Sequence, residues 1–491
     1  MDNLKTLKRT QVIVTVILVL SIIGSPITLM PMQFSLGQNN TISNNSNTSN
    51  TTSVSTPPTE TAVIPGKYIV KLKDPSALGG AALSISDPIS AVTTDIEDQG
   101  FDASVNRSLL GLNTYVLDIA PSENGSFSGA SLLDNSSVVS SVVENILEEN
   151  PLVESAQADM LMTIPEPISN ASDFKTSTQT IPRGIDRIDA EATNKSLQSA
   201  NADIAILDTG VNNHKDLNLF KNISFVGIST QDNCGHGTHV AGTAAARNNS
   251  FGVVGAAPDA RIWNVKVLEK TADGCSGSLS GILSGLNYVL ENADTIDVVN
   301  LSLGGYCPAW RSECDSSVYE SSINDLINAG VVVAVAAGNE ANPADWYVPA
   351  RFQNVITVSS ISDTDGKCGG MGTPSSFGDL DDSFSSYSNY GPIVDIAAPG
   401  SDILSTWNDG TFKSISGTSM ATPHVAGEAA LYKANHPDAS PSEVYNALLT
   451  SATKGNMQCD GNGHGYFTGD VDGVNEPLLY GKNVTTVSNP N

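Results

Sequence analysis

Positively charged residues are scarce in this chain, which has 24 lysines and arginines against 52 aspartates and glutamates. The formal net charge of -28 repels a phosphate backbone, so we expect no nucleic-acid partner. No C-x2-C pair is present, which argues against a zinc site of the usual ligand spacing. The length of 491 residues is enough for two or three domains.

The apolar run at residues 12–23 is shorter than a membrane span. Basic residues precede it and Gly24-Ser25-Pro26 follows it, so residues 1–36 match a secretory signal and predict export. The protein is therefore expected outside the cell. A retained anchor over residues 12–30, which would tether it to the cell surface, stays open because apolar residues resume after Pro26.

Residues 37–61 contain almost nothing that could be buried. They are rich in Asn, Ser and Thr, which predicts a disordered linker. N-x-S/T sequons stand at Asn39, Asn44, Asn47 and Asn50 and could carry glycans in an exported protein.

Three segments carry the residue types of nucleophilic catalysis. Asp203-Ile204-Ala205-Ile206-Leu207-Asp208-Thr209-Gly210 predicts a buried strand that ends in a carboxylate and a glycine turn. Cys234-Gly235-His236-Gly237-Thr238-His239 predicts a loop that opens into a helix. Gly417-Thr418-Ser419-Met420-Ala421 places a hydroxyl at a helix N-terminus, where unsatisfied N–H groups favour a developing anion. The chain order Asp, His, Ser is that of subtilisin.

With Ala336-Ala337-Gly338-Asn339-Glu340 as a fourth motif, residues 179–482 resemble a subtilisin-like serine endopeptidase of the subtilase family. The resemblance implies a three-layer α/β catalytic domain with a parallel sheet. It also implies polypeptide substrates and an acyl-enzyme mechanism. Glu476-Pro477-Leu478-Leu479-Tyr480 resembles the family's closing segment, so residues 483–491 are expected to be a tail, without a further domain.

The resemblance also implies the roles of the site residues. Ser419 is the expected nucleophile, His236 the base that takes its proton, and Asp208 the carboxylate that orients the imidazole. Asn339 and the Ser419 backbone N–H are the expected oxyanion donors, with a weaker contact from Thr418. His239, one turn after the catalytic histidine, resembles a packed family residue, and we expect it to be structural.

Several residues resemble the family's substrate-binding positions. Ser302, Leu303 and Gly304 resemble the edge segment that pairs with an extended peptide. Leu279 and Ile282, with Leu303, would line an apolar pocket for the fourth residue before the cut bond, although a plain core role is equally open. Glu340 corresponds to the rim of the primary pocket, and Tyr347 to its floor, although the spacing leaves the second match open.

Calcium is the cofactor that the resemblance implies. The segment at residues 247–253 resembles the family's calcium loop, in which backbone carbonyls and an Asn side chain supply oxygen ligands. The corresponding residues are Arg247, Asn249, Phe251 and Val253, together with Gln179 and Asp216. An ordinary Asn-rich turn is the alternative.

The six cysteines allow fifteen disulfide connectivities. In an exported chain the even number suggests disulfides. Cys307 and Cys314 flank a short loop and can pair locally. Cys234 and Cys275 occupy positions resembling a bridge in some thermostable members of the family, which leaves Cys368 with Cys459.

Residues 62–163 predict a separate small α+β domain of ferredoxin-like type. Strands are expected at 67–72 and 113–118, and helices at 89–99 and 137–148. The domain resembles the inhibitor-type propeptide of subtilases, which implies an intramolecular inhibitor that the enzyme removes by cutting the linker at 164–178. An independent adhesion module is the alternative.

In the catalytic region, continuous apolar runs predict the strands of a parallel sheet buried on both faces. These runs lie at residues 204–207, 262–268, 298–303, 331–336, 355–359 and 394–397. The acidic segments at 379–382 and 469–473 could bind further calcium, but both lack an EF-hand spacing, and we interpret them as solvated turns. The insertion at 363–382 has no assigned role.

Together these observations predict a secreted, calcium-stabilised, self-processing serine endopeptidase, expected to be a monomer. Two alternatives remain. One is a maturation protease dedicated to one partner, and the other is a cell-surface binding protein on a protease scaffold.

Overall fold

The computed structural model describes residues 62–484, apart from 78–86, 123–135, 165–177, 191–198, 200, 273, 311–313, 315, 462 and 483. The predicted signal segment, the Asn-rich linker with its sequons and the tail after 484 lie outside the described residues. So does the processing linker, except for its first and last residues.

The N-terminal domain is a four-stranded antiparallel sheet with two helices on it. Its core consists of apolar side chains from the strands and both helices, such as Val70, Val92 and Leu147. The elements are β1 (Val63–Leu72), α2 (Pro88–Asp98), β2 (Phe101–Leu109), β3 (Thr114–Pro121), α3 (Ser136–Glu149) and β4 (Val153–Thr163). The two predicted strands and two predicted helices are present. Strands β2 and β4 were not predicted, because most side chains of β2 face solvent and β4 buries polar Gln157 and Asp159.

Strand β4 continues this sheet into the catalytic region. It pairs antiparallel with β9 (Gly274–Ser278), which pairs with β8 (Glu269–Thr271), so the strand order is β2-β3-β1-β4-β9-β8. Side chains of β4 also reach the starts of two helices. The Asp159 carboxylate accepts from the Ser280 N–H at 3.0 Å, and Gln157 Oε1 accepts from the Val318 N–H at 3.1 Å.

The catalytic region is built on an eight-stranded, mainly parallel sheet with the order β15-β14-β12-β10-β5-β7-β6, and β16 pairs with β14. Only the β14–β15 pair is antiparallel among these described strands. The strands are β5 (Asp203–Asp208), β6 (Leu219–Ser224), β7 (Arg261–Lys266), β10 (Val298–Leu301), β12 (Val332–Ala336), β14 (Ile356–Ser362), β15 (Ser383–Phe384) and β16 (Ile396–Pro399).

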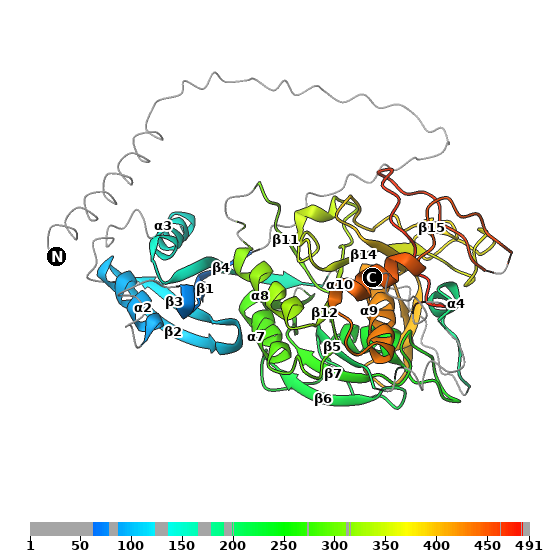
Figure 1. The fold of residues 1–491 in the computed structure, drawn as a ribbon, viewed down its shortest axis with the longest axis horizontal. Helices are drawn as coiled ribbons and strands as arrows, with labels where there is room; N and C mark the ends of the chain where they lie inside the picture. Colours follow the sequence, from blue (N-terminus) through cyan, green and yellow to red (C-terminus); the bar gives the residue numbers. More distant parts are fainter. Residues whose placement is uncertain are drawn as a thin grey trace, which may run out of the picture. The chain divides into compact units, whose positions relative to one another are not determined.

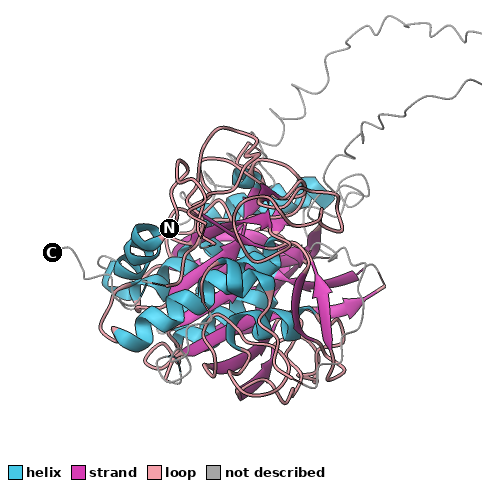
Figure 2. Cartoon of the chain, turned by 90° about the vertical axis from the view of Figure 1, so that its right-hand side faces the viewer, coloured by secondary structure: helices cyan, strands magenta, loops and turns pink. Residues whose placement is uncertain are grey.

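Helices cover both faces of this sheet, which gives the predicted three layers (Figures 1 and 2). Side chains alternate along β5: Ile204 and Ile206 join the core shared with α6 (His236–Ala245) and α9 (Thr418–Asn435). Ala205 and Leu207 join the core shared with α7 (Leu279–Leu290) and α8 (Ser317–Asn328). A strand buried on both faces needs apolar residues at every position, which explains the continuous runs in the sequence.

Smaller elements complete the region. They are α4 (Arg183–Arg187), β11 (Gly305–Tyr306), β13 (Tyr347–Val348), β17 (Ile403–Thr406), β18 (Phe412–Ile415) and α10 (Pro441–Ser451), with 3-10 turns at Pro75–Ala77, Leu110–Leu112 and Ala344–Trp346. Every predicted strand of the parallel sheet is present, with boundaries shifted by up to three residues. The edge strand β6 was not predicted, because its side chains are half-buried or exposed and give no apolar run.

The three disulfides are those expected, joining Cys234 to Cys275, Cys307 to Cys314 and Cys368 to Cys459. Within the described part of the chain, no helix combines the length and apolar character needed to cross a bilayer.

The interpretation of residues 379–382 as a solvated turn is wrong for its last two residues. Asp381 and Asp382 are 5% and 4% exposed. The Asp382 carboxylate pairs with the buried Arg187 guanidinium at 2.9 Å, and Asp363 pairs with the same guanidinium at 2.7 Å. The insertion is therefore held in place by buried ion pairs, which a local acidic pattern cannot predict because the arginine is far away in the sequence.

Candidate active site

Asp208 and His236 meet at the carboxyl end of β5. Asp208 is the last residue of the strand, and His236 is the first residue of α6. The imidazole Nδ1 lies 2.8 Å and 2.9 Å from the two carboxylate oxygens, and both side chains are almost fully buried. The Thr209 N–H donates to the same carboxylate at 2.6 Å. With Nδ1 held by the carboxylate, Nε2 is the nitrogen left for proton transfer.

Ser419 lies in the first turn of α9, which packs against α6. Its Oγ donates to the carbonyl of Ser302 at 3.3 Å, and the Ser302 hydroxyl donates to the Ser419 carbonyl at 3.0 Å. His236 Nε2 has no hydrogen-bond partner among the described residues. The Ser419 hydroxyl is therefore directed at the end of β10 in this structure.

Asn339 follows β12 at the same edge of the sheet. Its Oδ1 accepts from the Thr418 backbone N–H and from the Thr418 hydroxyl, both at 2.8 Å. These bonds orient the amide so that Nδ2 is the side available as a donor. Thr418 thus positions the Asn339 side chain through two hydrogen bonds. The sequence had led us to expect only a weak contact between Thr418 and the oxyanion.

The packed role expected for His239 is supported by its contacts. The side chain is fully buried, and Nε2 lies 2.9 Å from the Ile403 carbonyl and 3.0 Å from the Lys413 carbonyl. Burial lowers its pKa to about 3, so the ring is neutral.

Asp232 was not singled out in the sequence. Its carboxylate is 2% exposed and accepts from groups on both sides of the histidine loop. In the sequence, Asp232 is only an acidic residue four positions before His236. Acidic residues are common in loops, so this position alone predicts no role.

The predicted substrate-binding edge already holds a strand. Thr163, the last residue of β4, and Gly304 exchange two backbone hydrogen bonds of 3.0 Å, and the Ile164 N–H donates to the Cys275 carbonyl at 3.3 Å. The end of the N-terminal domain therefore lies between the segment that contains Gly304 and strand β9, which contains Cys275. It pairs with both through backbone hydrogen bonds, in the way expected for an extended peptide.

The predicted apolar pocket residues Leu279, Ile282 and Leu303 are buried in one cluster that also contains Met162 of β4. The three residues belong to the buried core in this structure, and one of the side chains packed with them, Met162, comes from the N-terminal domain. The observation therefore does not separate a pocket from a core role. Met162 precedes Thr163, so it stands one residue before the pair formed with Gly304.

Glu340 and Tyr347 lie close together beside Asn339. Glu340 Oε2 accepts from the Asn339 N–H at 2.9 Å and from Asn389 Nδ2 at 2.8 Å, and burial raises the pKa of this carboxyl. The Tyr347 hydroxyl accepts from Asn342 Nδ2 at 3.1 Å and is hydrogen-bonded to the Glu340 carboxylate. The two positions expected at the floor and rim of the primary pocket are thus in contact.

The six residues expected to bind calcium converge on one place. Gln179 Nε2 donates to the Arg247 carbonyl at 2.7 Å and to the Val253 carbonyl at 3.3 Å. Asn249 Nδ2 donates to Asp216 Oδ1 at 2.8 Å, and its Oδ1 accepts from the Phe251 N–H at 2.6 Å. Asp216 is fully buried, and burial raises its pKa to about 6.

These contacts fit a cation site. The Gln179 amide nitrogen lies between two backbone carbonyl oxygens, and a half-turn of this amide would place a further oxygen there, whereas the bonds of Asn249 to Asp216 and to the Phe251 N–H fix its orientation. A second acidic group is formed by Asp363, Asp365 and Asp381, each of which places one carboxylate oxygen within 4.8 Å of the others.

Parts of this chain are similar to known proteins. Residues 199–466 match the Subtilase family. Subtilisin Savinase from Lederbergia lenta is 41% identical over 278 residues, which are 56% of this chain and 92% of that protein. The M-protease of Shouchella clausii (strain KSM-K16) is 40% identical over 300 residues, 60% of this chain and 71% of that protein. A solved structure, a cold adapted subtilisin-like serine proteinase, is 34% identical with a TM-score of 0.44, covering 58% of this chain and 90% of that one.

Proposed function

The chain belongs to the Subtilase family of serine endopeptidases, and on that premise we propose that Asp208, His236 and Ser419 form its catalytic triad. Family membership makes the protein a protease that acts on polypeptides. The observation that carries the assignment of the residues is the contact between the buried Asp208 carboxylate and His236 Nδ1, at the carboxyl edge of the sheet that also carries Ser302 and Asn339.

In the proposed reaction, Ser419 Oγ attacks the carbonyl carbon of the peptide bond while His236 Nε2 takes the hydroxyl proton. The imidazolium then gives this proton to the leaving amine, and the C–N bond breaks to leave an acyl-enzyme. Water, deprotonated by the same nitrogen, hydrolyses the ester and restores the serine. Asp208 keeps the imidazole oriented and stabilises its cation.

The negative charge that develops on the carbonyl oxygen needs donors that are already oriented. Asn339 Nδ2 is one, because Thr418 holds the other end of the amide. The backbone N–H of Ser419 is the second, since N–H groups in the first turn of a helix have no acceptor within the helix.

The test of the triad uses Ser419→Ala and His236→Ala. Each should lower kcat by a factor on the order of 10⁶, the size of the loss for the corresponding residues of subtilisin. A fluorophosphonate should label the wild type at Ser419 and should not label Ser419→Ala. Unchanged hydrolysis by purified Ser419→Ala would reject the assignment.

We further infer that the N-terminal domain is an inhibitory propeptide that the enzyme removes. The pairing of Thr163 with Gly304, and the burial of Met162 with the proposed pocket residues, support this inference because they fill the substrate edge. Ser419→Ala should then remain an unprocessed precursor of full length. Recovery of the mutant at mature size, with no other protease present, would contradict self-processing.

Calcium is the proposed cofactor, held by Gln179, Asp216 and the loop at 247–253. The convergence of two backbone carbonyl oxygens on the Gln179 amide nitrogen supports this proposal. The ion would supply positive charge next to the buried Asp216 carboxylate and join the start of the catalytic domain to the loop after α6.

Export is proposed from the N-terminal segment. A peptide-library profile separates a broad protease from one dedicated to a single partner.

A further inference from the structure

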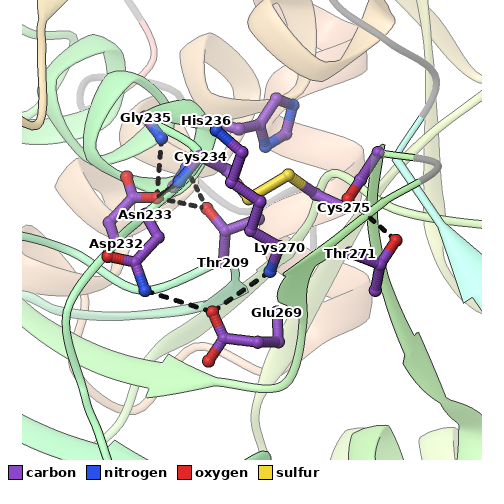
Figure 3. The surroundings of a disulfide bond; sticks show 12 residues. Thr209, Asp232, Asn233, Cys234, Gly235, His236, Glu269, Lys270, Thr271 and Cys275 are labelled. Carbon is purple, nitrogen blue, oxygen red and sulfur yellow. Dashed lines mark hydrogen bonds between the residues drawn. A yellow bond between two sulfur atoms is a disulfide. The ribbon is translucent and has the colours of Figure 1, made fainter.

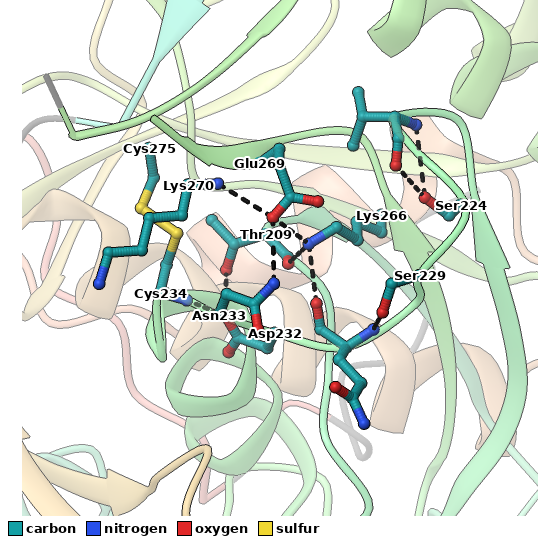
Figure 4. Close-up of polar contacts among 12 residues, drawn as sticks. Thr209, Ser224, Ser229, Asp232, Asn233, Cys234, Lys266, Glu269, Lys270 and Cys275 are labelled. Atoms are coloured by element: carbon teal, nitrogen blue, oxygen red, sulfur yellow. Dashed lines mark hydrogen bonds and ion pairs between the residues drawn. A yellow bond between two sulfur atoms is a disulfide. The ribbon is translucent and has the colours of Figure 1, made fainter. Parts of the chain in front are cut away.

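Thr209, which directly follows the proposed triad acid, is joined twice to the loop that precedes the histidine helix (Figure 4). Its hydroxyl donates to Asp232 Oδ1 at 2.8 Å. Its carbonyl accepts from Lys266 Nζ at 2.8 Å, and the same Nζ donates to the Gln231 carbonyl at 2.8 Å. The end of β5 and the loop before α6 are thus connected by two separate links.

Asp232 is the centre of the first link (Figure 3). Its Oδ1 also accepts from the backbone N–H groups of Cys234 and Gly235, at 3.0 Å and 2.7 Å. Its Oδ2 accepts from the N–H and the hydroxyl of Thr238, at 3.0 Å and 2.7 Å. One buried carboxylate therefore holds the loop before α6 and the first turn of the helix, whose N–H groups need acceptors. Hydrogen bonds to an ionised acceptor are the stronger kind.

The Thr209 hydroxyl extends this link beyond the histidine. While it donates to Asp232, its Oγ accepts from the Gly237 N–H at 3.0 Å. Residues on both sides of His236 are therefore fixed to the residue that follows Asp208.

Lys266 is the centre of the second link. It is the last residue of β7 and stands opposite Asp208 in the β5–β7 ladder. The side chain is fully buried, and besides the two carbonyls it pairs with Glu269 at 3.2 Å. This buried ammonium holds the Thr209 and Gln231 carbonyls next to each other, because moving either one would remove one of its three acceptors.

We propose that Asp232, Thr209 and Lys266 form a positioning bridge that sets the orientation of the His236 imidazole relative to the Asp208 carboxylate. None of the three is a catalytic residue, since each acts through the backbone that carries the triad. The proposal rests on the triad assignment. It adds that the distance of 2.8 Å between Nδ1 and the carboxylate is maintained by this bridge.

The expected consequence is a loss in kcat with KM retained. Among the described residues, the bridge has no hydrogen bond to Gly304, and it reaches Cys275 through the Cys234–Cys275 disulfide, so binding of a peptide should change less than the rate. A small displacement of a catalytic group can lower the rate on the order of 10²-fold.

The experiment compares Asp232→Asn with Asp203→Asn. Asp203 is a matched control, because its carboxylate is also buried, at 1% exposure, and hydrogen-bonded, accepting from Trp263 Nε1 at 2.6 Å. It lies at the start of β5, whereas Asp208 lies at the end of that strand. kcat, KM, the rate of fluorophosphonate labelling and Tm are measured for both. Asp232→Asn should lose about 10²-fold in kcat and in labelling rate with KM unchanged. Asp203→Asn should lower Tm and keep kcat. A wild-type kcat in Asp232→Asn would overturn the proposal.

A second pair keeps the test decisive if Asp232→Asn does not fold. Thr209→Val removes the hydroxyl and keeps the shape, so kcat should fall, whereas Thr209→Ser keeps the hydroxyl and should restore kcat. Equal kcat values in these two variants would reject the bridge. The triad assignment fails separately, through hydrolysis by Ser419→Ala, so an inactive Ser419→Ala with normal Thr209→Val and Asp232→Asn variants would refute the bridge alone.

Discussion

Thr163 and Gly304 exchange two backbone hydrogen bonds of 3.0 Å, so the end of the N-terminal domain pairs with the edge predicted to hold a substrate. Hydrogen-bonded pairs recur at every second residue of an antiparallel ladder. A peptide that continued this register would therefore place the residue two positions after Thr163 opposite Ser302, whose carbonyl lies 3.3 Å from Ser419 Oγ.

In this chain that residue is Pro165, which has no N–H to donate to the Ser302 carbonyl. We therefore predict that the bond after Pro165 is a poor processing site in the wild type. Pro165→Ala should shift the cut to this bond and speed the loss of precursor. N-terminal sequencing of the mature protein identifies the cut, and Pro167→Ala is the matched control. A wild-type cut between residues 165 and 166 would contradict the prediction.

Asn339→Ala should lower kcat on the order of 10²–10³-fold with little change in KM, because the developing oxyanion loses a donor. The change also removes the acceptor of two Thr418 donors, so stability should fall as well. Asn339→Asp separates the two effects, since it keeps an acceptor for Thr418 without the amide donor. If Asn339→Asp had wild-type kcat, the loss in Asn339→Ala would come from disordering and not from the oxyanion.

Removal of calcium should lower Tm and speed autolysis. A ligand at about 100 times its dissociation constant stabilises the folded state by roughly 2.7 kcal/mol. The Tm comparison is made on Ser419→Ala, which cannot digest itself, with added calcium and with EDTA. Asp216→Asn should abolish the difference, because it removes the one carboxylate of the proposed ligand set. The starting protein is freed of metal before either addition. An identical Tm with added calcium and with EDTA would then argue against the site.

Glu476→Gln should stabilise the protein above neutral pH. The Glu476 side chain is buried, and its Oε1 accepts from the Ser359 hydroxyl at 2.5 Å. Burial raises the pKa of this carboxyl from 4.5 to about 7. Below the unfolded pKa the group is protonated in both states and has no effect. As the pH rises toward 7 the unfolded state loses its proton first, so the native state loses relative stability.

The full penalty is reached above pH 7 and amounts to at most about 3 kcal/mol. Gln keeps the bond to Ser359 and carries no charge. In the Ser419→Ala background, the Tm of Glu476→Gln minus that of its parent should be small at pH 4 and should grow to pH 8. A difference that does not depend on pH would show that burial of the charge is not its cause.

Cleavage should favour an apolar residue four positions before the cut and disfavour Asp or Glu directly before it. Leu279, Ile282 and Leu303 offer no partner to a charge, and Glu340 would repel a carboxylate. If Tyr347 forms the floor of the primary pocket, large aromatic residues should be poor at the cleavage position and Tyr347→Gly should admit them. Efficient cleavage after Asp or Glu in a peptide library would reject the pocket. Strong cleavage after Phe or Tyr by the wild type would reject only the role of Tyr347.

The sequence by itself determined the parallel sheet and the place of Asp208 at the end of β5, whereas the proposed roles of His236 and Ser419 were implied by the resemblance of their motifs to the subtilase family. A strand buried on both faces requires a continuous apolar run, and a residue at the end of such a run lies at the carboxyl edge of the sheet. These are local constraints, so a local pattern reveals them. The loop at 247–253 was assigned through the same resemblance, and its calcium site stays a proposal.

Only the tertiary structure decided which distant groups meet. Arg187 pairs with both Asp363 and Asp382 across the fold, so part of an acidic turn that was predicted to be solvated is buried. Asp232 and Lys266 are both hydrogen-bonded to Thr209, which lies 23 residues before Asp232 and 57 residues before Lys266. Their proposed role depends on these contacts, which the sequence does not show. Strand β4 was not recognised because its polar Gln157 and Asp159 are paired with helix starts in the other domain. Burial of a polar group depends on its partner, and the partner is known only when the chain has folded.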